Sequence, residues 1–84
     1  MSDGAIRKTL LELAAEREGD ATFCPSEAAR RLSTHWRPLM PQVRQVAAVL
    51  VKEGRLRCTQ RGEPADPLAA KGPIRLAWGS QGGH

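Results

Sequence analysis

The first apolar pattern along the chain has the spacing of an amphipathic helix. In residues 4–18 the apolar positions are three or four residues apart, which places them on one helix face: Ile6, Leu10, Leu13 and Ala14. Asp3 is a suitable N-cap, and Gly19 is a suitable stop beyond the helix. The pattern therefore predicts a first helix over residues 4–18.

A second, shorter helix is predicted over residues 25–33, where Ala28, Ala29 and Leu32 form the inward face. Pro25 suits the first helical position, because the N–H that it lacks would have no partner there. Glu27 stands at the N3 place of a capping box, where its carboxylate also meets the positive end of the helix dipole.

Two prolines separate this helix from the next one. Pro38 and Pro41 do not both fit a helix interior, so residues 34–40 are predicted to be an ordered turn, with a turn of 3₁₀ helix. Pro41 then begins a third helix over residues 41–53, which Gly54 ends. Its inward positions are Val43, Val46, Ala47 and Leu50.

The pattern then changes to the two-residue period of strands. Residues 55–60 and 73–78 alternate apolar and polar side chains, and residues 61–72 form a long loop rich in glycine and proline. A hairpin of two strands is marginal alone and must pack on the helices. The predicted fold is mainly α with a small β-hairpin (α+β): a winged helix-turn-helix with three helices and a two-stranded wing. One domain spans residues 1–79, and the tail at 80–84 is predicted to be disordered.

Composition narrows the classes of function. With 84 residues the chain is long enough for one small domain. Cys24 and Cys58 lack the paired spacing of a zinc site and are predicted to be small apolar side chains with free thiols. No apolar run approaches the roughly 20 residues of a membrane span, and no signal-peptide pattern is visible. We expect a cytoplasmic protein that is not an enzyme, with no catalytic residues, metal, cofactor, membrane contact or small-molecule substrate.

Charge is distributed unevenly. The formal net charge is +4, but residues 30–61 carry eight basic side chains against Glu53 alone, a net +7. Residues 1–20 carry three basic and five acidic side chains, a net −2. A clustered positive field favours a polyanionic partner, although a merely solvated basic surface would give the same count.

Several short blocks carry a resemblance. The stretches "CPSEAARRL", "WRPLMPQVRQVAAVLVKEGRLRCTQRG" and "KGPIRL" contain the patterns P-S-E-x-A-R, W-R-x-L-M followed by V-R, T-Q-x-G and G-P-I-R. In this order they resemble a family of small bacterial proteins of unknown function, over roughly residues 5–77. The resemblance implies a winged-helix fold and no particular activity, because one fold supports many functions.

The expected function is DNA binding, as in a small transcription-associated factor, with residues 41–53 as the recognition helix. Arg44 is a candidate for reading guanine and a glutamine for reading adenine, while other cations would meet phosphates. The candidate nucleic-acid-binding residues are Arg30, Arg31, Arg37, Gln42, Arg44, Gln45, Lys52, Arg61 and Lys71. The alternative is a protein-interaction module that uses the same helix face and wing. Trp36 is interpreted as a plug of the turn, with base stacking as the minor reading.

Overall fold

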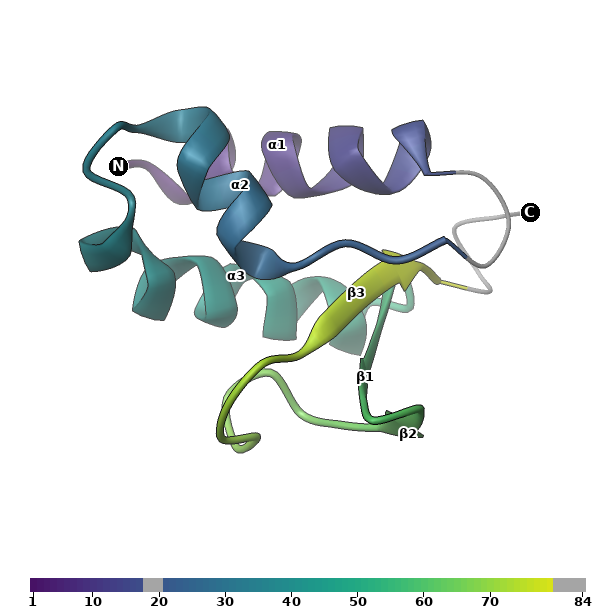
Figure 1. The fold of residues 1–84 in the computed structure, drawn as a ribbon. Coiled ribbons are helices and arrows are strands. Elements are labelled where there is room, and N and C mark those ends of the chain that lie inside the picture. Colours follow the sequence, from purple (N-terminus) through teal and green to yellow (C-terminus); the bar gives the residue numbers. More distant parts are fainter. Residues whose placement is uncertain (18–20, 80–84) are drawn as a thin grey trace.

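Three helices and an antiparallel sheet make up the fold (Figure 1), and the computed structural model describes residues 1–17 and 21–79. The elements are α1 (Asp3–Glu16), α2 (Pro25–Leu32), the 3₁₀ turn η1 (Arg37–Leu39), α3 (Met40–Lys52), β1 (Leu56–Gln60), β2 (Glu63–Pro64) and β3 (Arg75–Trp78). The predicted α+β class is confirmed. The expected disorder of residues 80–84 and the expected helix stop at Gly19 lie outside the described residues.

Helix α1 begins one residue before the predicted start. Ser2, and not Asp3, is the cap, because its Oγ accepts a hydrogen bond from the Ala5 N–H at 3.2 Å. Asp3 lies in the first turn, where the helix dipole favours a negative charge. The helix ends at Glu16, two residues earlier than predicted, and Arg17 is already extended.

Helix α2 begins at Pro25 as predicted. The Glu27 side chain folds back so that its Oε2 accepts the Cys24 N–H at 2.9 Å, which is half of the predicted capping box. The helix ends at Leu32, one residue earlier than predicted, because Ser33 adopts extended backbone angles. Ala28 and Ala29 are fully buried, and these two small side chains let α2 lie close to α1 and α3.

The turn between α2 and α3 contains the predicted 3₁₀ segment, η1, closed by a hydrogen bond from the Leu39 N–H to the Trp36 carbonyl at 2.9 Å. Helix α3 begins at Met40, one residue before the predicted start, with Pro41 in its first turn. The helix ends at Lys52, one residue earlier than predicted; Glu53 is its C-cap, and Gly54 comes next with a φ of +80° that favours glycine.

The sheet has three strands where two were predicted. β1 pairs antiparallel with β3, with Leu56 opposite Trp78, as the hairpin interpretation requires. The predicted long loop is interrupted by β2, which pairs with the end of β1 through a turn at Arg61 and Gly62. Both turn residues have positive φ, which lets the chain reverse within two residues. The strand order is β2-β1-β3.

A further backbone pairing joins the sheet to the start of the chain. Phe23, between α1 and α2, exchanges two hydrogen bonds of 2.8 Å with Leu76 of β3. Thus β3 is flanked by β1 on one side and by this short extended segment on the other.

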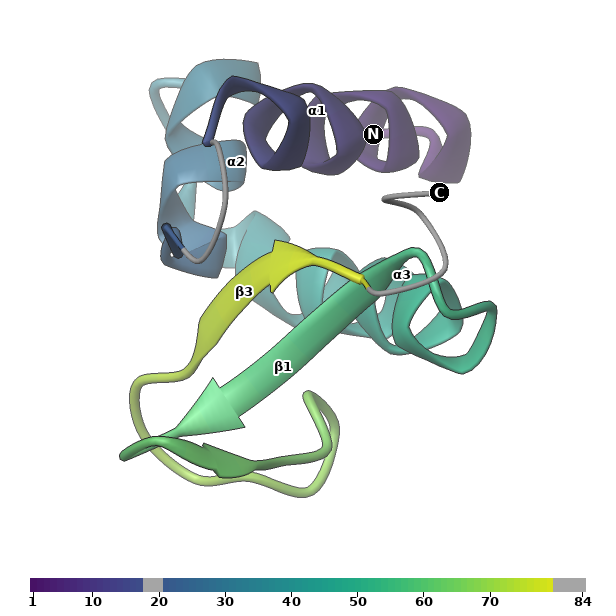
Figure 2. The ribbon, with the colours of Figure 1, turned by 90° about the vertical axis from the view of Figure 1, so that its right-hand side faces the viewer.

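One core lies between the helices and the sheet. Strand β1 packs against α3, and β3 packs against α1 (Figure 2). The predicted inward faces of the helices are buried, except that Leu32 is half-buried, and the core adds Phe23, the strand residues Leu56 and Leu76, and Ile74 just before β3. Trp78 is half-buried and packs on the core from its edge. Among the described residues, no helix is long and apolar enough to cross a membrane.

Candidate nucleic-acid interface

Arg44, the predicted guanine reader, points to the loop that follows β2. Its Nη1 donates hydrogen bonds to the carbonyl oxygens of Pro67 at 3.2 Å and Ala70 at 2.8 Å. Its Nη2 donates to the Gly72 carbonyl at 2.6 Å. The guanidinium is thus held by three carbonyl oxygens of the loop, and three of its N–H donors are engaged within the molecule. Arg44 fastens the loop to α3 and does not face outward as a base-reading side chain would.

Gln42, another predicted base reader, also bonds within the molecule. Its Nε2 donates to the Met1 carbonyl at 2.7 Å and to Asp3 Oδ1 at 2.8 Å. These bonds connect the start of α3 with the start of α1. The amide of Gln42 would have to break both bonds before it could contact a base edge.

Arg31 is paired with an acid of α1. Its two terminal nitrogens donate to both Glu16 oxygens, at 2.8 and 3.0 Å. These hydrogen bonds raise the pKa of Arg31 and lower the pKa of Glu16. Part of the positive charge predicted for residues 30–61 is therefore compensated by the acidic start of the chain.

Arg30 and Arg37 differ from Arg31 because an aromatic ring holds them. The central guanidinium carbon of each lies 4.6 Å from the centroid of the Trp36 ring. Such a cation–π contact contributes about 0.5–1 kcal/mol at an exposed site. Neither arginine forms an ion pair with a carboxylate of the described residues, and both are exposed. We call this group, Arg30, Trp36 and Arg37, the arginine–tryptophan cluster.

The remaining predicted contacts are exposed but scattered. Gln45 and Lys52 lie on the outer side of α3, and Arg61 lies in the turn before β2. Lys71 is exposed near the end of the loop, where its carbonyl accepts the Gln60 side-chain amide at 2.5 Å. The structure therefore divides the predicted residues into two groups: those whose side chains already bond within the chain, and those whose side chains are exposed to solvent.

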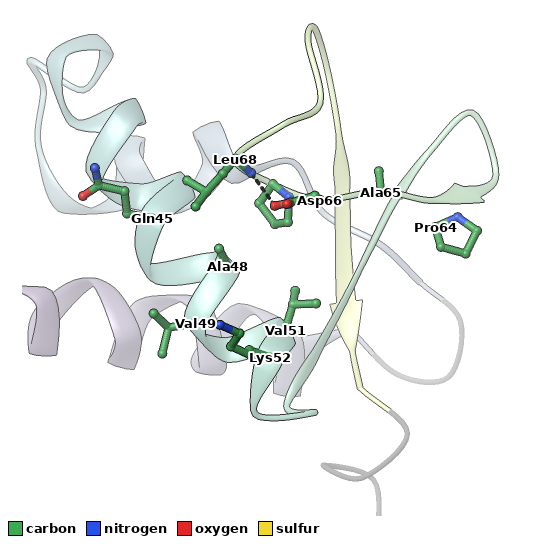
Figure 3. Close-up of a pocket in the computed structure, with 10 residues that line it drawn as sticks. Gln45, Ala48, Val49, Val51, Lys52, Pro64, Ala65, Asp66 and Leu68 are labelled. Atoms are coloured by element: carbon green, nitrogen blue, oxygen red, sulfur yellow. Dashed lines mark hydrogen bonds between the residues drawn. The ribbon is translucent and has the colours of Figure 1, made fainter.

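A groove lies between α3 and residues 64–68, which form its two walls (Figure 3). Its volume is about 570 Å³, and its walls are mostly apolar: Ala48, Val49, Val51, Pro64, Pro67 and Leu68. Gln45 and Lys52 supply polar positions on the helix side, and Asp66 accepts the Leu68 N–H at 2.8 Å on the loop side. Val49 is 51% exposed and Leu68 is 61% exposed. We call this hollow the α3 groove.

Arg75 of β3 binds the segment that precedes α2. Its guanidinium donates to the Thr22 hydroxyl at 2.9 Å and to the Thr22 carbonyl at 3.1 Å. Glu27, at the start of α2, is paired with Arg17. Arg75 therefore strengthens the contact between β3 and the segment before α2.

The two cysteines are free thiols. Burial raises the pKa of Cys58, so this thiol stays protonated and unreactive at neutral pH. Cys24 is half-buried at the start of α2, where its sulfur accepts a hydrogen bond from the Ser26 hydroxyl at 3.2 Å. Across residues 1–17 and 21–79, the structure has no group of three or more histidine, cysteine or acidic side chains that could hold a metal ion.

Comparison with known families gives one result. Residues 3–79 match the family model described as "Protein of unknown function (DUF3253)", which covers most of the 84 residues. A search of curated proteins finds no match. The match agrees with the resemblance found in the sequence, and its description names no substrate or partner.

Proposed function

The chain belongs to the DUF3253 family, and from its geometry we propose that it is a winged-helix protein that binds duplex DNA. The order of elements supports the fold assignment: a helix, a short extended segment at Phe23, two helices joined by a tight turn, and the β1 and β3 hairpin. The short strand β2 pairs with the free edge of β1 and so adds a third strand to this hairpin.

The observation that carries the proposal is the position of exposed cations at the two ends of α3. Arg37 begins the 3₁₀ turn η1, three residues before the helix starts at Met40, and Lys52 is the last residue of the helix. A helix of 13 residues is about 20 Å long at 1.5 Å per residue. Cations at its two ends therefore span a DNA major groove, which is about 12 Å wide, and reach phosphates on both of its sides.

The proposed binding depends on phosphates and is nearly independent of sequence. Arg44 and Gln42 are occupied by hydrogen bonds within the domain. Of the predicted base readers only Gln45 is exposed on α3, and its neighbours in the α3 groove are apolar. Phosphate contacts give affinity without sequence information, so duplexes of different sequence should bind alike.

We expect the Arg37→Gln/Lys52→Gln double variant to bind duplex DNA more weakly and with a smaller salt dependence. Each lost phosphate contact reduces the slope of log K against log salt by about 0.9, so the slope should become less steep by about 2. Fluorescence polarisation of two labelled duplexes of unrelated sequence, titrated at several salt concentrations, measures this change.

A matched control is Arg7→Gln/Arg55→Gln, which removes the same formal charge. Both of these arginines pair with Glu53, so this variant should retain the wild-type slope. The proposal fails if the wild type does not bind at ~100 µM protein in ~50 mM salt, because non-specific binders typically reach about 10⁻⁴–10⁻⁶ M even at physiological salt. It also fails if the two variants lose affinity equally.

A second candidate function is supported by the α3 groove. Val49 and Leu68 are large apolar side chains that are more than half exposed and face the same groove. We propose that this groove would accept an apolar segment of another protein that carries an acidic residue beside Lys52. Lys52 forms no ion pair with the described carboxylates, so its charge is available to such a residue. Exposed apolar patches rimmed by polar residues mark contact sites for proteins or other apolar partners.

For this candidate, Val49→Gln/Leu68→Gln should abolish capture of a partner protein at about 0.5 M NaCl, a salt concentration at which phosphate contacts are weak. Ala15→Gln, on the exposed side of α1, is the control and should capture the partner normally. The captured protein is then purified and titrated against both variants. Equal binding to the wild type and the Val49/Leu68 variant would exclude the α3 groove as the contact.

A further inference from the structure

The arginine–tryptophan cluster has an aromatic ring at its centre, which phosphate binding to a duplex would not require. Trp36 packs against the core along part of its surface, so the position of the indole is fixed by the fold. Arg30 comes from α2 and Arg37 from η1, and both meet this ring at 4.6 Å. Two arginines from different elements are thus held against one aromatic ring, and neither forms an ion pair with a described carboxylate.

A hollow adjoins the ring on the side of the turn. Its volume is about 230 Å³, and it is lined by Thr34, His35, Trp36, Arg37 and Pro38. Thr34 and His35 are exposed, so a hydroxyl and an imidazole are available at its rim. The hollow therefore combines flat rings, hydrogen-bonding groups and a guanidinium within one turn of the chain.

We propose that the arginine–tryptophan cluster and this hollow form a binding site for an unpaired nucleotide of a single-stranded nucleic acid. The guanidiniums of Arg30 and Arg37 contact backbone phosphate, and the base stacks in the hollow against His35 and Trp36. Proteins that bind single strands combine these two elements, a cationic path for the backbone and aromatic rings for the bases.

The chemistry of the site favours a single strand over a duplex. Base pairing and stacking hide the faces of the bases in a duplex, so only its phosphates could meet the cluster. An unpaired nucleotide presents phosphate and base face together, and its base can stack on an aromatic or guanidinium plane. This site lies in the turn before α3 and is separate from the α3 groove, because the two hollows share no lining residue.

The test uses Trp36 as its own reporter. The chain has two tryptophans, so a Trp78→Phe background leaves Trp36 as the only indole. This protein is titrated with single-stranded octathymidylate, with octauridylate and with an abasic strand of the same length. We expect saturable quenching by thymidylate or uridylate, and the preferred strand shows whether the source is DNA or RNA. The abasic strand should bind at least about tenfold more weakly, because it lacks stacking worth ~1–3 kcal/mol per base.

Arg30→Gln and Arg37→Gln, each in the same background, should both weaken the binding of the quenching strand by about fivefold or more. Both side chains are exposed, so the fold should be unaffected, as circular dichroism would verify. Arg7→Gln/Arg55→Gln should remain within about twofold of the parent. The inference is overturned if neither base-containing strand quenches Trp36, if the abasic strand binds equally well, or if the two arginine variants bind as the parent does.

These outcomes are separate from those of the duplex experiment. Quenching by a base-containing strand without duplex binding would support this site and refute the proposed function. Duplex binding without quenching would support the proposed function and refute this site. Lys52→Gln provides a further separation, because it should weaken duplex binding and leave the affinity for the quenching strand unchanged.

Discussion

Replacing Arg44 with alanine should destabilise the domain by about 2–4 kcal/mol, because three hydrogen bonds from a charged donor are lost together. The Pro67 carbonyl belongs to a buried residue, and the Ala70 carbonyl to a half-buried one, so water replaces these bonds incompletely. Denaturant unfolding monitored by circular dichroism measures the loss. A change below about 0.5 kcal/mol, the range of ordinary surface substitutions, would show that Arg44 does not hold the loop.

Two comparisons make the Arg44 experiment specific. Arg44→Lys keeps the charge but not the planar fork of donors, so it should restore only part of the stability. Arg61→Ala removes an exposed arginine from the turn before β2 and should be nearly neutral. The Arg44→Ala loop should also open locally, which would accelerate tryptic cleavage after Lys71 relative to the wild type.

Replacing Gly79 with alanine should cost about 3 kcal/mol or more, because the added methyl group would overlap backbone atoms that have no room to move. Its carbon would overlap the Gly54 carbonyl oxygen and lie 2.8 Å from the carbonyl carbon of Arg55. The Gly79 N–H also donates to the Arg55 carbonyl at 2.8 Å, a bond that the displaced chain would lose. In a domain of this size such a loss lowers Tm by about 4–8 °C for each kcal/mol.

Gly4→Ala is the matched control for this substitution. Gly4 lies in the first turn of α1, and a methyl group there would meet nothing within 4 Å. Alanine has the higher helix propensity, so this variant should be neutral or slightly more stable. Differential scanning calorimetry of both variants measures the two Tm values. If Gly79→Ala and Gly4→Ala had the same Tm, the close approach at Gly79 would be refuted.

The sequence was informative wherever the physical cause is local. Apolar periodicity predicted the inward faces of all three helices, since each helix must bury one side on the core. Pro25 and Gly54 marked helix ends because their backbone preferences act within one or two residues. The boundary errors of one or two residues arose where neighbouring residues were nearly equal candidates, as Ser2 and Asp3 were for the cap of α1.

Strand β2 was missed because neither the strand nor the turn before it has a strong local signal in the sequence. It has two residues, one of them Pro64, and so lacks both alternation and a complete set of backbone donors. The turn at Arg61 and Gly62 that brings it beside β1 requires positive φ at both positions. Glycine favours such angles, but arginine seldom adopts them, so the turn had no strong signal in the sequence.

The candidate site was predictable only as a list of basic and glutamine side chains, without their contacts. Arg44 and Gln42 were placed correctly away from the apolar stripe of α3, but their partners lie 23 to 41 residues away along the chain. Contacts at that separation depend on the folded topology, which no local pattern records. The cluster around Trp36 had a nearer signal, because Trp36 and Arg37 are adjacent and Arg30 lies only six residues before Trp36, in the last turn of α2.

The hydrogen bonds between Phe23 and Leu76 also bear on how the domain is made in a cell. Residues near the start of the chain complete the sheet only after β3 has left the ribosome, because β3 is the last described strand. Until then β1 and β2 are the only described strands available to cover the helices, and α1 lacks β3, the strand that packs against it. Such late pairing raises the contact order and slows folding. During synthesis this domain therefore depends on its final strand, and a ribosome that stalls before residue 75 would display an incomplete core to chaperones and proteases.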